Sequence, residues 1–261
     1  YVQKFPFKSL KVIGSVGEPI NEEAWHWYND HVGGKKCPVV DTWWQTETGG
    51  ILISPIAFVT PTKPTYATLP LPGIQPVLMD DKRNEIEGNQ VVGSLCIKFP
   101  WPGIARTIWG DHQRYKDTYF SAFPGKYFTG DGALRDEVGY YRITGRVDDV
   151  VIVSGHNLGT APIEDAINEH PAVAESAIVG FPHDIKGNAL YGYVILKETG
   201  EYRDRDNLSK EINQHISDHI GPIAKLDKIQ FVSGLPKTRS GKIMRRILRK
   251  IAEGDFSNFG D

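Results

Sequence analysis

A run of basic residues near the end of the sequence is the first feature that points to chemistry. Between Lys237 and Lys250 there are seven basic residues and no acidic one, although the 261-residue chain has a formal net charge of −2. Within this run, Lys242 follows Gly241 at the expected start of a helix, where the helix dipole attracts anions rather than cations. A lysine at that position is explained if a phosphate binds beside it. The sequence therefore predicts that Lys242 is presented to a phosphate.

The arginines of the same run have a simpler interpretation. Ile243, Ile247 and Ile251 recur every four residues and form an apolar stripe along the expected helix. Because charged helix faces are common at protein surfaces, we expect the opposite side to be solvated. That side carries Arg245, Arg246, Arg249 and Lys250. A nucleic-acid-binding helix would need interleaved aromatic side chains and a net positive charge, so we expect neither a nucleic acid nor a membrane as partner.

The segment 41–50, with the sequence DTWWQTETGG, combines an acid, hydroxyl and amide side chains with two tryptophans. It follows an expected strand, and loops at the carboxyl ends of strands in an α/β sheet commonly hold ligands. Trp43 and Trp44 alone would be interpreted as core aromatic residues. Because polar residues follow them directly, we predict a ligand-binding loop.

A second candidate site centres on Asp131, which lies between two glycines in the sequence YFTGDGA. A carboxylate with bare backbone on both sides can accept hydrogen bonds from a ribose diol, but Gly-Asp-Gly also occurs in ordinary turns. From the residues alone both interpretations stay open. Arg146 and an acid pair follow, ahead of a glycine-flanked SGH sequence.

The order of expected elements indicates two kinds of architecture. The first part alternates short buried strands with a helix that starts after Asn21, and the proline-rich stretch 60–94 is typical of a small β-rich part. Further strands follow, joined by tight turns at Gly139 and Gly145. The order helix, strand, strand, helix, strand, helix then indicates a small α+β domain. We predict an α/β and α+β fold class with domains at 1–147 and 148–261.

The composition narrows the class of protein. At 40% hydrophobic residues the chain can bury a substantial core. Its two cysteines, Cys37 and Cys96, match no zinc or redox spacing, so we expect a reducing, cytoplasmic compartment. The sequence contains no run of about 18 apolar residues, and it begins with neither a signal pattern nor an initiator methionine. We therefore expect a fragment whose N-terminal part is missing.

Taken together and in this order, the motifs resemble those of the acyl- and aryl-CoA synthetase superfamily of adenylate-forming enzymes. Their sequences are most similar to those of the AMP-forming acetyl-CoA synthetases. The matching segments are GEPIN, DTWWQTETGG, ARTIWGDHQRY, YFTGDGA, GRVDDVVIVSGH and LPKTRSGKIMRRILRKIA. They span essentially the whole chain. The family's Ser/Thr/Gly-rich phosphate loop is not in this sequence. The resemblance therefore implies the end of the large AMP-binding domain, followed by the complete small and mobile C-terminal domain.

The resemblance implies an acid–thiol ligase that uses ATP, CoA and magnesium. In that family a carboxylate attacks the α-phosphate of ATP to give an acyl-AMP and pyrophosphate, and the thiol of CoA then displaces AMP. Such chemistry depends mainly on positioning and charge stabilisation. The implied substrate is acetate, and the alternatives are propionate or another short-chain acid, or a non-catalytic nucleotide-binding homologue. Without the phosphate loop, we do not expect the chain to be fully active alone.

The resemblance also implies roles for individual residues. Lys242 matches the family's adenylation lysine, and Glu47 matches the acid associated with magnesium. Asp131 and Arg146 match the ribose-binding pair. The other residues implied in ATP and AMP binding are Gly17, Glu18, Pro19, Asp41, Thr42, Trp43, Trp44, Gln45, Thr46 and Asn157.

Further positions correspond to the acyl pocket and to the second half-reaction. Trp44 matches the tryptophan that closes the acyl pocket in acetate-specific members, where an indole excludes longer chains by overlap. Asp148 matches the hinge about which the small domain swings. Ser154 and Gly155 match residues that meet CoA.

Two positions depart from the family's pattern. Asn157 stands where many members have an arginine after SGH, which leaves amide hydrogen bonding in place of a charge. Ser217 stands where an arginine on the CoA side is expected. Either another cation, Arg245 or Arg246, contacts the CoA phosphates instead, or the affinity for CoA is lower.

Two further implications concern a metal and a modification. His170 and Val173 match a secondary metal site of some bacterial members, although a histidine in the sequence EHPAV is also a common helix-end residue. Lys242 in its glycine loop is chemically open to acylation, so lysine-acetylating and deacetylating enzymes are expected partners. The sequence leaves the oligomeric state open.

Overall fold

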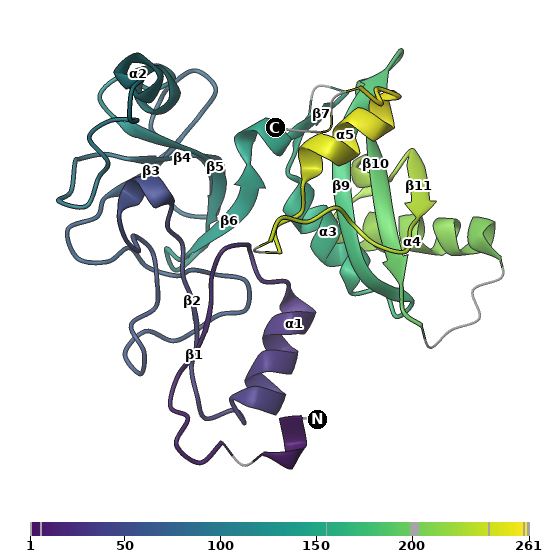
Figure 1. The fold of residues 1–261 in the computed structure, drawn as a ribbon, viewed down its shortest axis with the longest axis horizontal. Coiled ribbons are helices and arrows are strands. Elements are labelled where there is room, and N and C mark those ends of the chain that lie inside the picture. The colour runs from purple at the N-terminus through teal and green to yellow at the C-terminus, as the bar shows by residue number, and fades with distance from the viewer. Residues whose placement is uncertain are drawn as a thin grey trace. The chain divides into compact units, whose positions relative to one another are not determined.

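The computed structural model describes residues 2–5, 7–154, 156–198, 204–239, 241–257 and 259, with the side chains of Gln3 and Asn157 also outside this description. The chain divides into two compact units, Tyr1–Val147 and Asp148–Asp261 (Figure 1). Each unit has its own hydrophobic core. In the described ranges, no helix is both long and apolar enough to cross a membrane.

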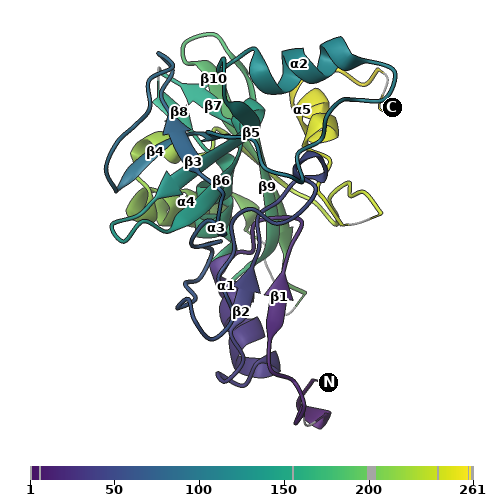
Figure 2. The same cartoon turned by 90° about the vertical axis from the view of Figure 1, so that its left-hand side faces the viewer.

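The first unit begins with a parallel pair of strands, β1 and β2, connected through α1 (Figure 2). The bounds are Ile13–Ser15 for β1, Glu22–Trp27 for α1, Tyr28–Val32 for the π-helical turn after it, and Val39–Asp41 for β2. The side-chain oxygen of Asn21 accepts a hydrogen bond from the backbone N–H of Ala24 at 2.7 Å. This bond satisfies an amide that has no partner within the helix. The prediction of a helix that starts after Asn21 is therefore confirmed.

The larger sheet of the first unit is antiparallel, with the strand order β3-β4-β5-β6. The strands are Pro76–Met79, Val91–Ile97, Tyr127–Arg135 and Tyr141–Arg146, and α2 is His112–Phe120. Their core includes Trp43, Leu78, Leu95 and Trp101. The loop that follows β2 therefore packs against this sheet through Trp43.

The two glycines expected in turns occupy different environments. Gly139, with a φ of 90°, lies in the turn between β5 and β6, as predicted. Gly145, with a φ of 114°, instead lies within β6, where it pairs with Gly132 beside a shift in register. The prediction of a turn at Gly145 is wrong, because this positive φ accompanies a β-bulge inside the sheet.

The second unit is a mixed sheet in which β10 pairs with β7, β9 and β11, and β8 pairs with β7 (Figure 1). The strands β7 to β11 are Val151–Val153, His156–Leu158, Val173–His183, Gly187–Leu196 and Lys228–Phe231. The helices are α3 (Thr160–Asn168), α4 (Arg205–His219) and α5 (Arg245–Glu253). The predicted order of helices and strands in this part of the chain is confirmed.

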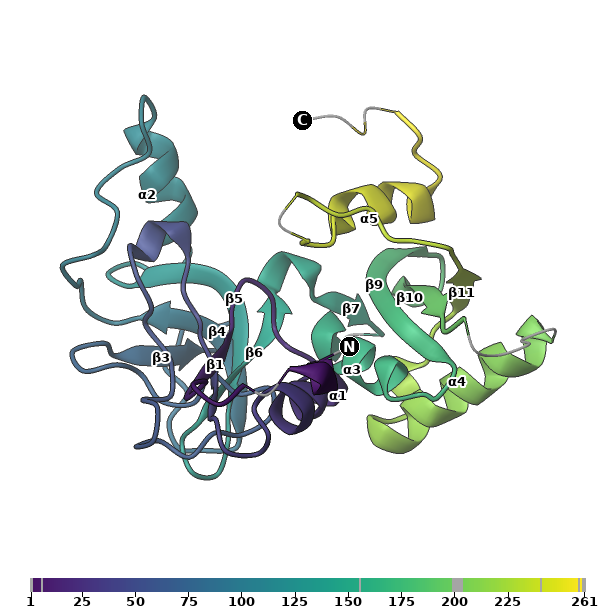
Figure 3. The same ribbon diagram turned by 60° about the horizontal axis from the view of Figure 1, so that its bottom comes forward.

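Helices cover both faces of this second sheet. Successive side chains of a strand point to opposite faces, and along β9 Ile178 belongs to the core formed with α3 and α4. Ala177 and Val179 belong to the other core, which includes Leu248 of α5. Figure 3 shows α4 and α5 on opposite sides of the sheet. Short 3₁₀ turns occur at Val2–Lys4, Thr46–Thr48, Val147–Asp149 and Pro222–Ala224.

The closing helix begins later than predicted. α5 begins at Arg245, and Lys242 precedes it in a turn across which Lys237 and Ile243 pair as bridge partners. The backbone amide of Thr238 donates to the carbonyl oxygen of Lys242 at 2.9 Å. This bond fixes Lys242 in the turn. The placement of Lys242 at a helix N-terminus is therefore wrong, although its exposure is as expected.

The basic side of α5 is only partly solvated. Arg245 Nη2 lies 2.7 Å from Glu164 Oε2, and the two side chains are 17% and 10% exposed. Arg249 Nη2 lies 2.7 Å from Asp149 Oδ1, whereas Arg246 is exposed. The expectation of a solvated face is wrong for Arg245, because the packing of α5 on the sheet brings it onto a buried carboxylate of the same unit. Arg249 is paired as well, but its side chain stays 36% exposed.

Glu164 connects three elements inside the second unit. Its Oε1 accepts the backbone amide of Ile178 on β9 at 2.8 Å, and its Oε2 binds Arg245 on α5. Burial raises the pKa of the Glu164 carboxyl, and the Arg245 cation opposes this rise. The side chain thus joins α3, β9 and α5 through one buried ion pair.

The Glu164→Gln substitution should destabilise the second unit by about 3–5 kcal/mol, because it takes the carboxylate away from a buried arginine. All six tryptophans lie between residues 25 and 109, so amide hydrogen exchange of β9 and β10 is the suitable measurement. The control is Glu175→Gln, since the Glu175 carboxylate lies equally close to Lys237 (2.7 Å) but in a pair that is 34–38% exposed. An exposed pair contributes less than about 1 kcal/mol. Equal losses in the two variants would contradict the assigned role of burial.

Candidate functional site

The centre of the candidate site is the buried carboxylate of Asp131 on β5. Its Oδ2 accepts hydrogen bonds from Trp43 Nε1 and from Gln45 Nε2, each at 3.1 Å. On the other side, Arg146 Nη1 of β6 lies 3.5 Å from Oδ1. Buried carboxylates require such donors and a nearby cation to replace their lost hydration. The structure thus brings together Asp131 and Arg146, which the sequence predicted as a ribose-binding pair.

A glycine beside Asp131 makes room for the arginine. Gly130 has a φ of 73°, and a Cβ added there would lie 2.5 Å from Nη2 of Arg146. A residue with a side chain would therefore displace the guanidinium. Arg146 Nη1 also donates to the carbonyl oxygen of Thr129 at 3.1 Å. The glycine that the sequence placed before the acid is needed for a close approach, rather than for a turn.

Gln45 fastens the loop 41–50 to the sheet. Its Nε2 donates to the carbonyl oxygen of Thr129 at 2.7 Å, and its Oε1 accepts the hydroxyl of Tyr127 at 2.9 Å. Its backbone amide donates to Thr48 Oγ1 at 2.9 Å, which caps the short 3₁₀ turn. The loop is therefore held from both sides before any ligand binds.

Gly49 allows this loop to lie against a second segment. Its φ is 68°, and a Cβ there would lie 2.0 Å from the carbonyl oxygen of Gly103. The indole of Trp101 donates to the carbonyl oxygen of Thr48 at 2.8 Å. Only glycine can occupy this position without moving the backbone.

Glu47 lies half-buried at the end of the same loop. Its Oε1 accepts a hydrogen bond from the hydroxyl of Tyr119, whose ring stacks on that of Tyr127 with 5.2 Å between centroids. Burial, together with the Glu47 carboxylate, raises the pKa of Tyr119 to about 12. Tyr119 therefore stays neutral and orients the carboxylate as a hydrogen-bond donor.

The other predicted nucleotide-binding residues gather at the carboxyl ends of β1 and β2. Ser15 pairs in register with Asp41, and Thr42 Oγ1 donates to the carbonyl oxygen of Ser15 at 3.3 Å. The exposed segment Gly17, Glu18 and Pro19 begins two residues after the end of β1. The parallel register therefore brings this segment and the start of the loop 41–50 to one edge.

The two adjacent tryptophans have different environments. Trp43 is 7% exposed and belongs to the core, as the simpler interpretation expected, and it also donates to Asp131. Trp44 is 44% exposed in this chain. Thr46, two residues further on, is exposed as well. The assignment of Trp44 to an acyl pocket stays a prediction.

The remaining predicted residues belong to the second unit. Lys242 is exposed, directly after Gly241 with a φ of 89°. The carbonyl oxygen of Asp148 accepts a bond from Arg249 at 3.3 Å, and Ser154 has a left-handed φ of 50°. Gly155 lies outside the described residues. The backbone of Asn157 lies in β8, paired with Ile152, while its side chain is outside the description.

The predicted metal residues His170 and Val173 have internal partners. The ring nitrogen Nδ1 of His170 lies 3.3 Å from the backbone amide of Ala172, which donates to it. Val173 is fully buried at the start of β9. Its side chain belongs to the core of the second unit. The metal assignment of these two residues stays a prediction.

Sequence reasoning missed the contribution of Tyr119, Tyr127 and Thr129. The missed signal is the alternation in YFTGD, which places Tyr127, Thr129 and Asp131 two residues apart along one strand. Tyr119 gave no such signal, because its contact with Glu47 spans 72 residues.

Comparisons with known proteins bear on both units. A family model described as AMP-binding enzyme matches residues 2–109, and one described as AMP-binding enzyme C-terminal domain matches residues 162–242. The chain belongs to the AMP-binding enzymes. Solved structures agree with this membership. An anthranilate CoA ligase, AuaEII, in complex with anthranoyl-AMP superimposes with a TM-score of 0.83 at 26% identity, over 96% of this chain and 46% of that one. An ATP-bound RpMatB-BxBclM chimera superimposes with a TM-score of 0.80 at 25% identity, over 92% of this chain and 45% of that one.

Curated relatives of this AMP-binding enzyme share much more of its sequence. It is 61% identical over 260 residues to the acetyl-coenzyme A synthetase of Parvibaculum lavamentivorans, which is 100% of this chain and 40% of the relative. It is 60% identical over 254 residues to the acetyl-coenzyme A synthetase of Syntrophobacter fumaroxidans, which is 97% of this chain and 39% of the relative. The chain thus spans about 40% of the length of these relatives. The predicted adenylate-forming fold is confirmed.

Asp41 gives this AMP-binding enzyme a pH-dependent stability. Burial raises the pKa of Asp41 to about 7, and the hydrogen bond from the Thr42 backbone only partly opposes this. An unfolded aspartate titrates near pH 4. Between about pH 4 and pH 7 the folded chain therefore binds one more proton than the unfolded chain. The free energy of unfolding should fall as the pH rises through this range, by about 1.4 kcal/mol per pH unit from this group.

The Asp41→Asn variant should lose this pH dependence of the free energy of unfolding, because its side chain does not titrate. Urea unfolding followed by tryptophan fluorescence measures it, since all six tryptophans lie in the first unit. Asp117→Asn, the same substitution at an exposed site on α2, serves as control and should keep the pH dependence. If wild type and Asp41→Asn show parallel pH profiles, Asp41 does not titrate near pH 7.

Proposed function

We propose that this AMP-binding enzyme is an acetate–CoA ligase that activates acetate with ATP and transfers the acetyl group to CoA. The support is its identity of about 60% to acetyl-coenzyme A synthetases along nearly the whole chain. Because the chain spans about 40% of those relatives, the activity is proposed for the whole protein. In the first half-reaction, an acetate oxygen attacks the α-phosphorus of ATP and pyrophosphate leaves. In the second, the CoA sulfur attacks the acetyl carbonyl carbon and AMP leaves.

The observation that carries the nucleotide assignment is the fixed carboxylate of Asp131. Trp43 and Gln45 hold one of its oxygens, and Arg146 lies beside the other. Two ribose hydroxyls are suitable donors to a carboxylate that is oriented in this way. Because these protein donors are already in place, a nucleotide would bind without reorganising the loop, which favours affinity.

Glu47 fits the role of a magnesium ligand in this proposal. Magnesium binds through one or two carboxylates together with substrate phosphates and keeps several waters. Tyr119 holds Oε1 of Glu47, so Oε2 is the oxygen proposed to meet the ion. When bound, the ion would neutralise phosphate charge. The protein's contribution is to keep the carboxylate oriented through a neutral tyrosine.

Lys242 is the proposed cation for the adenylation step. It lies in a short turn in which its amide donates to Thr238 Oγ1 at 3.1 Å, and its side chain is exposed. An ammonium on such a turn can neutralise the charge that develops on the α-phosphate. Asp148 as a hinge and Ser154 with Gly155 as CoA contacts belong to the same proposal, and so does acylation of Lys242.

The Lys242→Ala variant of the whole protein should lose acetate-dependent ATP–pyrophosphate exchange by at least about 100-fold, because it lacks the cation proposed for the transition state. The control is Lys237→Ala in the same segment, since Lys237 is already paired with Glu175. Exchange that persists in Lys242→Ala would remove the lysine from the mechanism. No exchange in a folded wild type with any short acid would favour a non-catalytic nucleotide-binding protein.

The Trp44→Gly variant should accept longer acids, because removal of the indole opens the proposed acyl pocket. The measurement is acid-dependent pyrophosphate exchange with acetate, propionate, butyrate and valerate. Trp27→Gly, which removes a similarly exposed indole from α1, should leave the acid preference unchanged. A Trp44→Gly protein that is active with acetate but still rejects butyrate would contradict the pocket assignment.

A further inference from the structure

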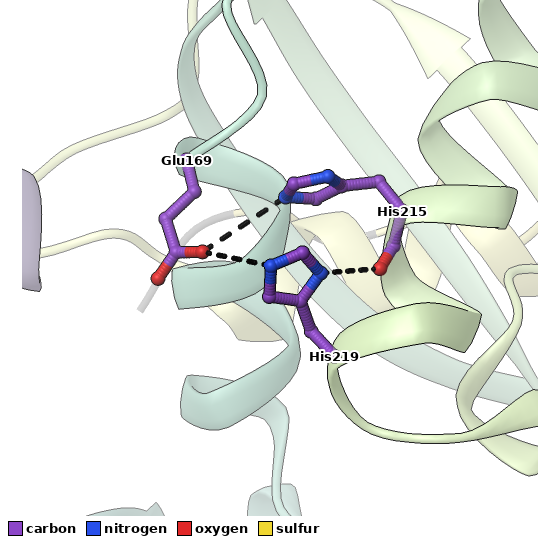
Figure 4. Close-up of side chains that lie close together, drawn as sticks. All are labelled: Glu169, His215 and His219. Atoms are coloured by element: carbon purple, nitrogen blue, oxygen red, sulfur yellow. Dashed lines mark hydrogen bonds and ion pairs between the residues drawn. The ribbon is translucent and has the colours of Figure 1, made fainter.

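Two histidines and a glutamate converge where α3 and α4 end in the second unit. His215 and His219 lie one turn apart on α4, and Glu169 is the residue directly after α3 (Figure 4). Glu169 Oε2 lies 3.9 Å from His215 Nε2 and 3.6 Å from His219 Nε2. One ligand atom from each side chain lies within 4.8 Å of the others.

The hydrogen bonds of His219 determine which of its nitrogens faces the glutamate. Its Nδ1 lies 2.8 Å from the backbone carbonyl oxygen of His215. A carbonyl oxygen can only accept, so Nδ1 carries the hydrogen. In the neutral ring Nε2 then presents a lone pair, and this is the nitrogen that points at Glu169 in Figure 4. A backbone carbonyl commonly fixes the tautomer of a metal-binding histidine in this way.

His215 adds an independent sign of a missing partner. Its Nε2 is buried, and within the described part of the chain it has no hydrogen-bond partner. Buried polar atoms are almost always hydrogen-bonded, so an exception requires an explanation. A nitrogen lone pair and a carboxylate oxygen that face each other also repel, unless a proton or a cation lies between them.

We propose that Glu169, His215 and His219 bind a divalent transition-metal ion, and that zinc fits them best. Two imidazoles and one carboxylate are a common zinc donor set, with bonds of about 2.0–2.2 Å. Tetrahedral angles then place the donor atoms about 3.4 Å apart. The two oxygen-to-nitrogen separations of 3.6 and 3.9 Å need to close by only a few tenths of an ångström. The three ligand atoms all lie within 4.8 Å of one another, so a side-chain rotation of the histidines would bring the remaining pair together. Glu169 and His219 are 38% and 46% exposed, so a water can complete the coordination.

The surroundings favour a cation at this place. The site lies at the C-terminal ends of two helices, where the helix dipole is negative. The ring of His170 lies edge-on to that of His215, with 5.8 Å between centroids. This site uses side chains other than the pair His170 and Val173 that the family resemblance implied.

A bound ion would join α3 to α4 across the edge of their shared core. Ile167 of α3 and Ile212 and Ile216 of α4 pack in that core, next to the three proposed ligands. An ion that binds the folded unit and not the unfolded chain stabilises it in proportion to the logarithm of the ion concentration above the dissociation constant. The site is therefore proposed as a structural metal site that stabilises the second unit. It is independent of the proposed ligase activity.

The test is titration of the metal-stripped, tag-free chain with zinc chloride by isothermal calorimetry at neutral pH. We expect one saturable zinc site per chain. The zinc affinity should be more than about tenfold weaker in His215→Gln and in His219→Gln, because even the loss of a residue that only hydrogen-bonds to a metal ligand commonly weakens metal binding about 10–100-fold. His26→Gln is the matched control, since His26 also lies 3.6 Å from a glutamate one helical turn away but has no third ligand among the described residues. Its affinity should equal that of wild type.

Two further measurements keep the result decisive. Glu169→Gln changes an exposed side chain without altering α4, so a loss of binding in this variant cannot be explained by an unfolded helix. Hydrogen exchange in α3 and α4 should slow on adding zinc to wild type and should not change in the His215 variant. Wild-type binding that equals that of the His219→Gln variant, or the absence of a saturable site, would overturn the proposal.

Discussion

The buried carboxylate of Asp131 is the interaction on which the candidate site depends. A carboxylate leaves water only when protein donors replace its hydration. Trp43 and Gln45 come from the loop after β2, and Arg146 comes from β6. The charge therefore ties the loop after β2 to the paired strands β5 and β6. The same bonds that satisfy Asp131 hold the loop in the conformation proposed for nucleotide binding, so fold and function share them.

The second unit meets the same electrostatic constraint with ion pairs. Glu164 lies beneath α5 and is satisfied by Arg245 and by an amide of β9. This arrangement leaves the turn before α5 outside the helix, and Lys242 lies in that turn. The buried ion pair of Arg245 holds the start of the helix in place, and the lysine three residues before it stays exposed. The core fixes where α5 begins, and Lys242 remains accessible to an anion.

Predictions succeeded where the signal was local and failed where it was not. The N-cap at Asn21 and the order of strands and helices depend on neighbouring residues, and the structure has them as expected. The solvated face of α5 was inferred from a helical periodicity that cannot include partners elsewhere in the chain. Arg245 reaches a carboxylate 81 residues away. Likewise, the periodicity could not show that a bridge between Lys237 and Ile243 delays the helix.

The sequence by itself determined the family and the order of the elements, and it predicted the residues proposed for the nucleotide site, because all of these depend on contiguous motifs. Only the tertiary structure decided that Gly130 makes space for Arg146, that Tyr119 orients Glu47, and that His215 and His219 meet Glu169. Each of these depends on side chains from different elements that approach within a few ångströms. Such distances follow from packing over a shared core, which no local pattern encodes.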